Sequence, residues 1–302
     1  MERNKVIDIM KGLAIISVVF AHSSSNNVSY QHIFNVIGLF GVPVFFFVAG
    51  FLFKNSTLKN LLIKKKSILI KWLISGSIIY LYVYLRKYNL SLVTYLNFLF
   101  GFNSYLYFLT CYFIILIIMY ILFTIRKIYI EIFFLFLSFI FLQNTKIFIF
   151  GSIRPLSFFC YFYLGFFFKS HGISIFSDKK VSAKYIITFL LCVILIVIIN
   201  KDINYVSYYG FKSTVTCLLG IVCLYYLSII INHCFNSVKF ITIELGKNTL
   251  DIYLWHMLFI GIINRMEFIP FLFKPILTIA VTYFFIKIVC TFINLNRGKV
   301  KS

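Results

Sequence analysis

Residues 105–124 read Y-L-Y-F-L-T-C-Y-F-I-I-L-I-I-M-Y-I-L-F-T and contain no charged side chain. A helix needs about 20 predominantly apolar residues to cross the hydrocarbon core of a bilayer, which is the length of this stretch. Comparable apolar runs recur from Ile7 to Lys287, separated by short polar segments. The sequence therefore predicts an all-α fold, a polytopic membrane helix bundle.

The composition excludes a water-soluble protein. Apolar residues make up 62% of the 302 residues and charged residues only 12%, whereas soluble domains carry about 25% charged residues. The net charge of +21 comes from lysines and arginines that stand between the apolar runs, where we expect them to face anionic membrane lipid and not nucleic acid. The seven cysteines form no C-x-x-C pair, so we expect no zinc site and no other metal.

The apolar runs predict about ten transmembrane helices. Their approximate bounds are 7–23, 33–53, 67–85, 105–124, 128–144, 147–168, 185–200, 211–232, 247–264 and 271–293. Lysine and arginine are most frequent in the connections on the side of the N-terminus, so both termini are predicted to be cytoplasmic. No connection is long enough for a soluble module, so residues 1–302 are predicted to form a single membrane-embedded domain. The aromatic stretch 92–102 is an alternative candidate for a re-entrant segment.

The first predicted span carries Asp8, Lys11 and His22 on one face. At about 100° per residue, Lys11 and His22 differ by about 20° in azimuth and lie about 16 Å apart along the helix axis. An ionisable residue inside a membrane is costly unless it faces the bundle interior or a water-filled cavity. This face is therefore predicted to line a cavity, with a carboxylate–lysine pair near its cytoplasmic end and an imidazole near its outer end.

Several further segments carry polar or small residues inside apolar runs. They are G-V-P-V-F-F-F-V-A-G-F-L-F (41–53), L-Y-F-L (106–109), F-F-C-Y-F-Y-L-G-F-F (158–167) and L-G-K-N-T-L-D-I-Y-L-W-H (245–256). In this order, and with ten residues between Lys11 and His22, the chain resembles acyltransferase family 3. This family consists of bacterial integral membrane proteins that O-acetylate cell-surface sugars and related acceptors.

The resemblance implies an O-acetyltransferase of the bacterial inner (cytoplasmic) membrane. It would move an acetyl group from acetyl-CoA to a hydroxyl of a cell-surface or lipid-linked glycan, such as O-antigen, capsule or exopolysaccharide. Histidine suits removal of the hydroxyl proton at neutral pH, so His22 is the expected base. The other candidate catalytic residues are Asp8 and His256. The candidates for binding the donor are Lys11, Lys64, Lys65 and Lys66. The candidates for binding the acceptor are Arg154, Asn248, Tyr253 and Tyr107.

Two features of the sequence limit these assignments. A rise of about 21 Å separates Asp8 from His22 on an α-helix, too far for Asp8 to orient the imidazole directly. The family often has paired arginines where this chain has Lys64, Lys65, Lys66 and Lys71, and lysine keeps the charge but lacks the planar fork that binds phosphate bidentately. Tyr107 stands where the family often has tryptophan, which preserves an aromatic wall.

A transporter or flippase of a lipid-linked sugar is the alternative function, because it also needs a polar cavity inside a bundle. Transporters commonly show internal repeats and paired broken helices, and the sequence indicates neither. Another acyl group in place of acetyl remains an alternative, since the size of the donor depends on the shape of the cavity.

Overall fold

The computed structural model describes residues 4–23, 27–54, 58–84, 91–102, 104–125, 128–143, 154–173, 176, 181–202 and 210–299. All regular elements in these ranges are α-helices. They are α1 (Lys5–His22), α2 (Val28–Leu39), α3 (Gly41–Leu52), α4 (Leu58–Tyr84), α5 (Leu92–Leu99), α6 (Tyr107–Ile125), α7 (Ile128–Gln143), α8 (Arg154–Ser170), α9 (Ala183–Ile199), α10 (Phe211–Cys234), α11 (Asn236–Lys247), α12 (Thr249–Ile263) and α13 (Phe273–Lys299). The predicted all-α fold is confirmed.

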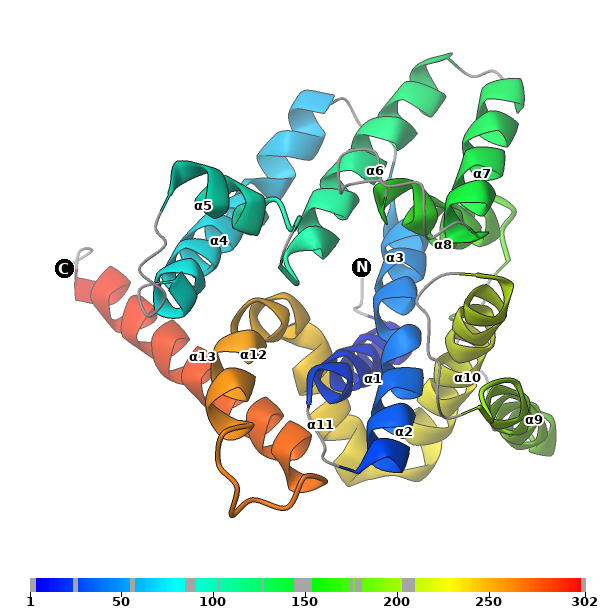
Figure 1. The fold of residues 1–302 in the computed structure, drawn as a ribbon. Coiled ribbons are helices and arrows are strands. Elements are labelled where there is room, and N and C mark those ends of the chain that lie inside the picture. Colours follow the sequence, from blue (N-terminus) through cyan, green and yellow to red (C-terminus); the bar gives the residue numbers. More distant parts are fainter. Residues whose placement is uncertain are drawn as a thin grey trace.

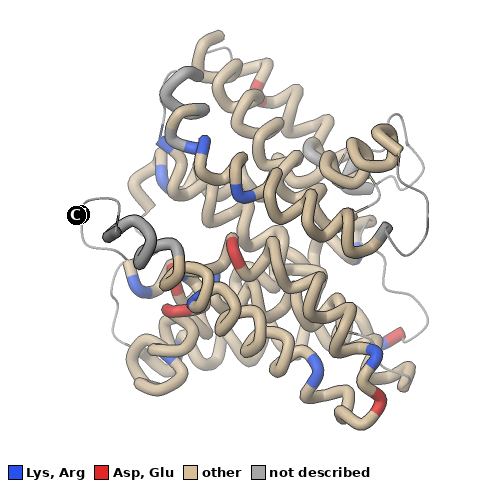
Figure 2. The backbone as a smooth tube through the Cα atoms, turned by 90° about the vertical axis from the view of Figure 1, so that its left-hand side faces the viewer, with Lys and Arg blue, Asp and Glu red and all other residues tan. Residues whose placement is uncertain are grey.

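Five helical segments in the described residues are long and apolar enough to cross a membrane: 28–52, 65–83, 107–125, 211–234 and 273–292. Four shorter apolar helices lie within α7, α8, α9 and α12. Long stretches of helix carry no charge at all (Figure 2). The chain is therefore a multi-pass membrane protein, while the count of about ten spans and the side on which the termini lie stay predictions.

Helix α1 lies at the centre of the bundle (Figure 1). It packs against α2, α3, α10, α11, α12 and α13, and its closest partner is α11. Glycines make this approach possible, because a Cβ atom on Gly12 would meet the backbone of Thr242 and one on Gly246 would meet the backbone of Asp8. Small residues at crossing points let the backbones of membrane helices come into contact, so α1 is held at a fixed position along α11.

The same arrangement joins α3 to α8. A Cβ atom on Gly50 would meet the carbonyl of Phe162, and one on Gly165 would meet the carbonyl of Phe47. Helix α8 in turn packs against α6 and α7. At the edge of the bundle, α9 packs against α10 (Figure 1). On the other side of the bundle, α4 packs against α12, α5 and α6.

Two helix breaks are not predicted from hydropathy. The predicted span 33–53 is divided at Phe40 into α2 and α3. Pro43 has no N–H to donate to the carbonyl of Leu39, and the thiol of Cys217 donates to that carbonyl instead at 3.3 Å. The predicted span 247–264 begins with a second break at Asn248, whose side-chain amide donates to the carbonyl of Glu244 at 2.8 Å.

The aromatic stretch 92–102 contains the short helix α5, which begins with a capping box between Ser91 and Thr94. Trp72 of α4 donates its indole N–H to the carbonyl of Leu99 at 3.2 Å, and the hydroxyls of Tyr80 and Thr94 form a hydrogen bond at 2.6 Å. These bonds hold α5 along α4.

Candidate active site

Two histidines from distant parts of the chain meet inside the bundle. His22 is the last residue of α1, and His256 lies in the middle of α12. Their ring centroids are 5.4 Å apart. His256 is completely buried, whereas the side chain of His22 is accessible. The pair thus combines an imidazole that a second molecule can reach with one that is held in the interior.

The hydrogen bonds of His256 define which nitrogen is protonated in its neutral form. Its Nδ1 lies 2.7 Å from the carbonyl oxygen of Tyr253. A carbonyl can only accept, so Nδ1 must carry the proton and Nε2 must carry a lone pair. Nε2 is buried and has no hydrogen-bond partner among the described residues. This buried basic nitrogen is unusual, because buried polar atoms are nearly always paired.

Two tyrosines fix the ring of His256 in place. The hydroxyl of Tyr105 donates to the carbonyl of Leu254 at 2.6 Å, and the hydroxyl of Tyr253 donates to the carbonyl of Tyr105. The ring of Tyr105 lies edge-on to His256 with centroids 5.5 Å apart. These reciprocal bonds connect the start of α6 to α12 and leave His256 little freedom to turn.

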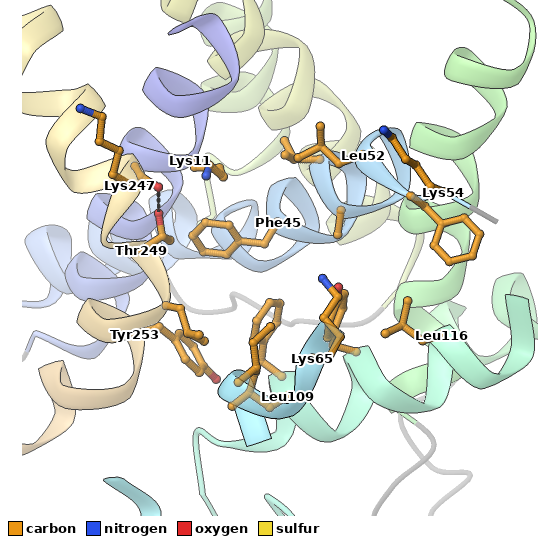
Figure 3. A pocket seen from close by; sticks show the side chains of 18 residues that line it. Lys11, Phe45, Leu52, Lys54, Lys65, Leu109, Leu116, Lys247, Thr249 and Tyr253 are labelled. Atoms are coloured by element: carbon orange, nitrogen blue, oxygen red, sulfur yellow. Dashed lines mark hydrogen bonds between the residues drawn. The ribbon is translucent and has the colours of Figure 1, made fainter. Parts of the chain in front are cut away.

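A cavity of about 490 Å³ opens beside this cluster, toward the end of α1 that carries Lys11. Its walls come from α1, α3, α4, α6, α11 and α12, and they are mostly apolar and aromatic. Four lysines line it: Lys11, Lys54, Lys65 and Lys247. Lys11 and Lys247 stand on one side and Lys65 stands across from them, with Phe45 between (Figure 3). Its size is typical of small-molecule sites, which measure about 300–1,000 Å³.

The lysines of the cavity differ in their partners. Lys11 pairs with Asp8 at 3.1 Å, and Lys247 pairs with Glu244 at 2.7 Å. Glu244 lies on α11, outside the span-forming helices. Its pKa is held below its usual value by hydrogen bonds, mainly from Lys247 and also from Lys287. Lys65 lies over the ring of Tyr112 at 5.4 Å. Neither Lys54 nor Lys65 has a carboxylate partner within the described residues, so the cavity carries net positive charge.

Tyr253 connects the cavity to the histidines. Its side chain lines the cavity, and its carbonyl accepts the hydrogen bond from His256. Phe108, another lining residue, packs on Tyr253 with ring centroids 5.0 Å apart. Tyr253 therefore both lines the lysine-lined cavity and holds the buried imidazole of His256.

The structure brings together only part of the predicted set. Asp8 lies with Lys11 at the lysine end of α1, away from the histidine pair. Lys66 is exposed and does not line the cavity. Tyr107 stacks on Phe158 with centroids 6.2 Å apart and is also outside the lining. The side-chain amide of Asn248 bonds a backbone carbonyl at the break before α12. The predictions for the side chains of Lys64 and Arg154 lie outside the described residues.

Three residues of the site are not predicted from the sequence as parts of it. Tyr105 is not among the candidate residues from the sequence, yet it packs against His256. Lys54 and Lys247 line the cavity but appear in the sequence as ordinary connection charges. Lys247 stands inside the segment L-G-K-N-T-L, directly before Asn248, and this position is the one sequence signal that points to it.

Comparison with protein-family models identifies the family of the chain. A family model described as an acyltransferase domain, that of acyltransferase family 3, matches residues 4–295, which is nearly the whole chain. No curated protein and no solved structure matches the chain significantly. The chain belongs to acyltransferase family 3 and is an acyltransferase embedded in a membrane.

Proposed function

We propose that the protein transfers an acetyl group from acetyl-CoA to a hydroxyl of a cell-surface or lipid-linked glycan, in the cytoplasmic membrane of a bacterium. The proposal rests on the cavity, which is lined by four lysines and by Tyr253. The carbonyl of Tyr253 accepts the hydrogen bond that holds the buried imidazole of His256. A donor with phosphates at one end and a reactive thioester at the other fits such a site. The acceptor would approach from the end of α1 at which His22 is accessible.

The distance between Lys11 and His22 along α1 supports acetyl-CoA as the donor. Lys11 and His22 lie about 16 Å apart along α1 by helical rise. In coenzyme A, about thirteen bonds connect the pyrophosphate oxygen to the acetyl carbonyl carbon, and at about 1.2 Å per bond an extended chain of this kind spans about 16 Å. The pantetheine arm can therefore place the thioester beside the histidines while the phosphates remain at the lysines. No covalent acetyl-enzyme is needed to cover this distance.

The proposed step is a direct acyl transfer. The hydroxyl oxygen of the acceptor attacks the thioester carbonyl carbon while His22 takes the hydroxyl proton. The C–S bond then breaks, the acetyl ester is complete, and the CoA thiolate leaves and takes the proton from the imidazolium of His22. The buried Nε2 of His256 would accept a hydrogen bond from the ring of His22 and so orient it. General-base catalysis by a positioned histidine contributes about 10²–10⁴-fold to such a rate.

A direct test uses the full chain in phosphatidylcholine nanodiscs and acetyl-CoA labelled in the acetyl group. Cells that express the protein should carry base-labile acetyl on their surface glycan, and the purified protein should transfer label to glycan extracted from cells that lack the gene. His22→Ala should lose at least about 10²-fold of this activity. His171→Ala is the matched control, because His171 is exposed in the turn after α8 and does not line the cavity.

The same experiment separates the transferase from a flippase. Transfer of label by the unchanged protein, lost in His22→Ala and kept in His171→Ala, supports the proposal. If the unchanged protein adds no acetyl while loss of the gene makes a lipid-linked glycan precursor accumulate, the protein moves the glycan and does not acetylate it. Transfer of label with equal rate by His22→Ala would remove His22 from the mechanism.

A further inference from the structure

Lys274 is a buried lysine at the end of the bundle opposite to the lysine-lined cavity. It lies in the first turn of α13, and only 9% of its surface is exposed. On the same face of α13, one and two turns further on, Thr278 and Thr282 are completely buried. This face of the helix therefore points into the bundle, and Lys274 points with it.

The ammonium group of Lys274 has little to compensate its charge. Its Nζ donates to the backbone carbonyl of Asn264 at 3.0 Å, whereas a lysine ammonium has three protons to donate. The ion pairs within the described residues engage Lys11, Lys71, Lys212, Lys247 and Lys287, and none includes Lys274. Glu267 belongs to the same loop as Asn264 and is exposed, but it makes no ion pair with Lys274.

A buried cation without a counter-charge is expensive in a membrane protein, and such residues are usually retained for function. The chain has 29 lysines and arginines but only eight aspartates and glutamates. The carboxylates of Asp8, Asp251 and Glu244 already pair with lysines. No described carboxylate neutralises Lys274, so its ammonium is available to an anion that binds.

Lys274 is connected to the histidine pair through Asn264. The side-chain amide of Asn264 donates to the carbonyl oxygen of His22 at 3.4 Å, and its own carbonyl accepts the bond from Lys274. Asn264 also ends α12, the helix that carries His256. Asn264 thus links the ammonium of Lys274 to the backbone of His22, at the end of α1 from which the acceptor would approach.

The loop that leads into α13 carries an aromatic residue, Phe271, three positions before Lys274. The backbone N–H of Lys274 donates to the carbonyl of Phe271 at 3.2 Å, and the ring of Phe271 packs on that of Tyr30 with centroids 4.4 Å apart. Tyr30 is exposed. A sugar ring offers an apolar face to such aromatic side chains and polar groups to a cation and an amide.

We propose that Lys274 binds an anionic group of the acceptor, a carboxylate or a phosphate carried by the sugar that is acetylated. This inference rests on the proposed function and adds the class of acceptor: an acidic glycan. The oxyanion would bind the ammonium of Lys274, with a sugar ring against Tyr30 and Phe271 and its hydroxyl near His22. Charge-assisted hydrogen bonds of this kind are the stronger ones in proteins.

The test uses the full chain in phosphatidylcholine nanodiscs and three soluble probes: methyl glucoside, which is neutral, methyl glucuronide, which has a carboxylate, and glucose 1-phosphate. At millimolar concentration the charged probes should raise the melting temperature of the unchanged protein and methyl glucoside should not. Lys274→Gln should weaken the apparent affinity for the charged probes about tenfold, while Lys274→Arg, which keeps the charge, should retain it. The charged probe that binds more tightly shows whether the site prefers a carboxylate or a phosphate.

Lys201→Gln is the matched control, because Lys201 is an exposed lysine after α9 and has no part in the site. Binding of acetyl-CoA to each variant shows that it is folded. The inference is overturned if no charged probe shifts the melting temperature, if methyl glucoside shifts it equally, or if Lys274→Gln keeps the shift. If the charged probes bind through Lys274 but no extracted glycan accepts acetyl, the anion site stands and the proposed transfer fails. If glycan is acetylated equally by Lys274→Gln, the transfer stands and this inference fails.

Discussion

The rings of His22 and His256 lie 5.4 Å apart although the two residues belong to the first and the twelfth helix of the chain. One ring is accessible and the other is buried with a bare lone pair on Nε2. A single base would suffice for removing a proton from a hydroxyl. The second, immobilised imidazole adds a fixed acceptor against which the ring of His22 can be oriented.

Replacement of His256 by leucine tests this role. Leucine fills a similar volume but removes both ring nitrogens, so we expect the kcat of acetyl transfer to fall about 10²-fold while the KM for acetyl-CoA stays the same. Steady-state kinetics with labelled acetyl-CoA measures both, and the melting temperature in nanodiscs reports any loss of folding. His171→Leu serves as the control. A raised KM with unchanged kcat would place His256 in donor binding instead.

Lys65 is the clearest test of the donor-binding cavity, because it lines the cavity and has no carboxylate partner in the described part of the chain. Replacing it with glutamine removes a charge without leaving a carboxylate unpaired. We expect the KM for acetyl-CoA to rise about tenfold, since a hydrogen bond to a charged group is worth about 1.5–3 kcal/mol. The effect should shrink at high salt.

Lys184→Gln is the control for this prediction, because Lys184 is exposed at the start of the peripheral helix α9. Its KM should remain that of the unchanged protein. Equal effects of the two substitutions would mean that Lys65 acts only through the general charge of the surface.

The close contact of α1 with α11 predicts that a larger residue at Gly246 destabilises the protein. A methyl group there would meet the backbone of Asp8, whereas a methyl group on Gly261 of α12 has nothing within 4 Å. Overpacking costs about 1–3 kcal/mol, so Gly246→Ala should lower the melting temperature by roughly 5 °C. Gly261→Ala should leave it unchanged or raise it slightly, because alanine favours the helix. Equal melting temperatures for the two variants would show that the helices can separate without cost.

The lowered pKa of Glu244 predicts how the stability of the protein depends on pH. Its pKa in the folded protein is lowered by Lys247 and Lys287, so the unfolded chain binds the proton more readily. The carboxylate therefore stabilises the fold above the unfolded pKa, about 4.3, and this contribution is lost as pH falls through the folded pKa. Below about pH 5 the melting temperature should decrease less steeply for Glu244→Gln than for the unchanged protein. Parallel curves would contradict the role of this carboxylate.

The all-helical membrane fold and the face of α1 could be predicted because each depends on local sequence. Apolar run length decides whether a segment can cross a bilayer, and helical geometry alone puts Lys11 and His22 on one side. The ion pair of Asp8 with Lys11 follows from a spacing of one turn. These features need no knowledge of how the helices are arranged.

The helix breaks and the surroundings of His256 could not be predicted, because they depend on contacts between distant segments. The segment around Phe40 is continuously apolar, and its division depends on Pro43 together with the thiol of Cys217 from α10. Tyr105 bonds the backbone of Leu254 and Tyr253 bonds the backbone of Tyr105, which requires the segment just before α6 to lie beside α12. Similarly, the lysines of the cavity cannot be separated in the sequence from lysines that only mark topology.

The glycine contacts of α1 with α11 have a mechanical consequence. Lys11 and His22 sit on one uninterrupted helix, and that helix cannot slide along its neighbour, because no space separates their backbones. Under the proposed function, both substrates reach a stationary centre from opposite faces of the membrane, without the rocking of two halves that a transporter performs. Turnover of such an enzyme would be driven by the thioester alone, so collapsing the proton or sodium gradient across the membrane would leave its rate unchanged.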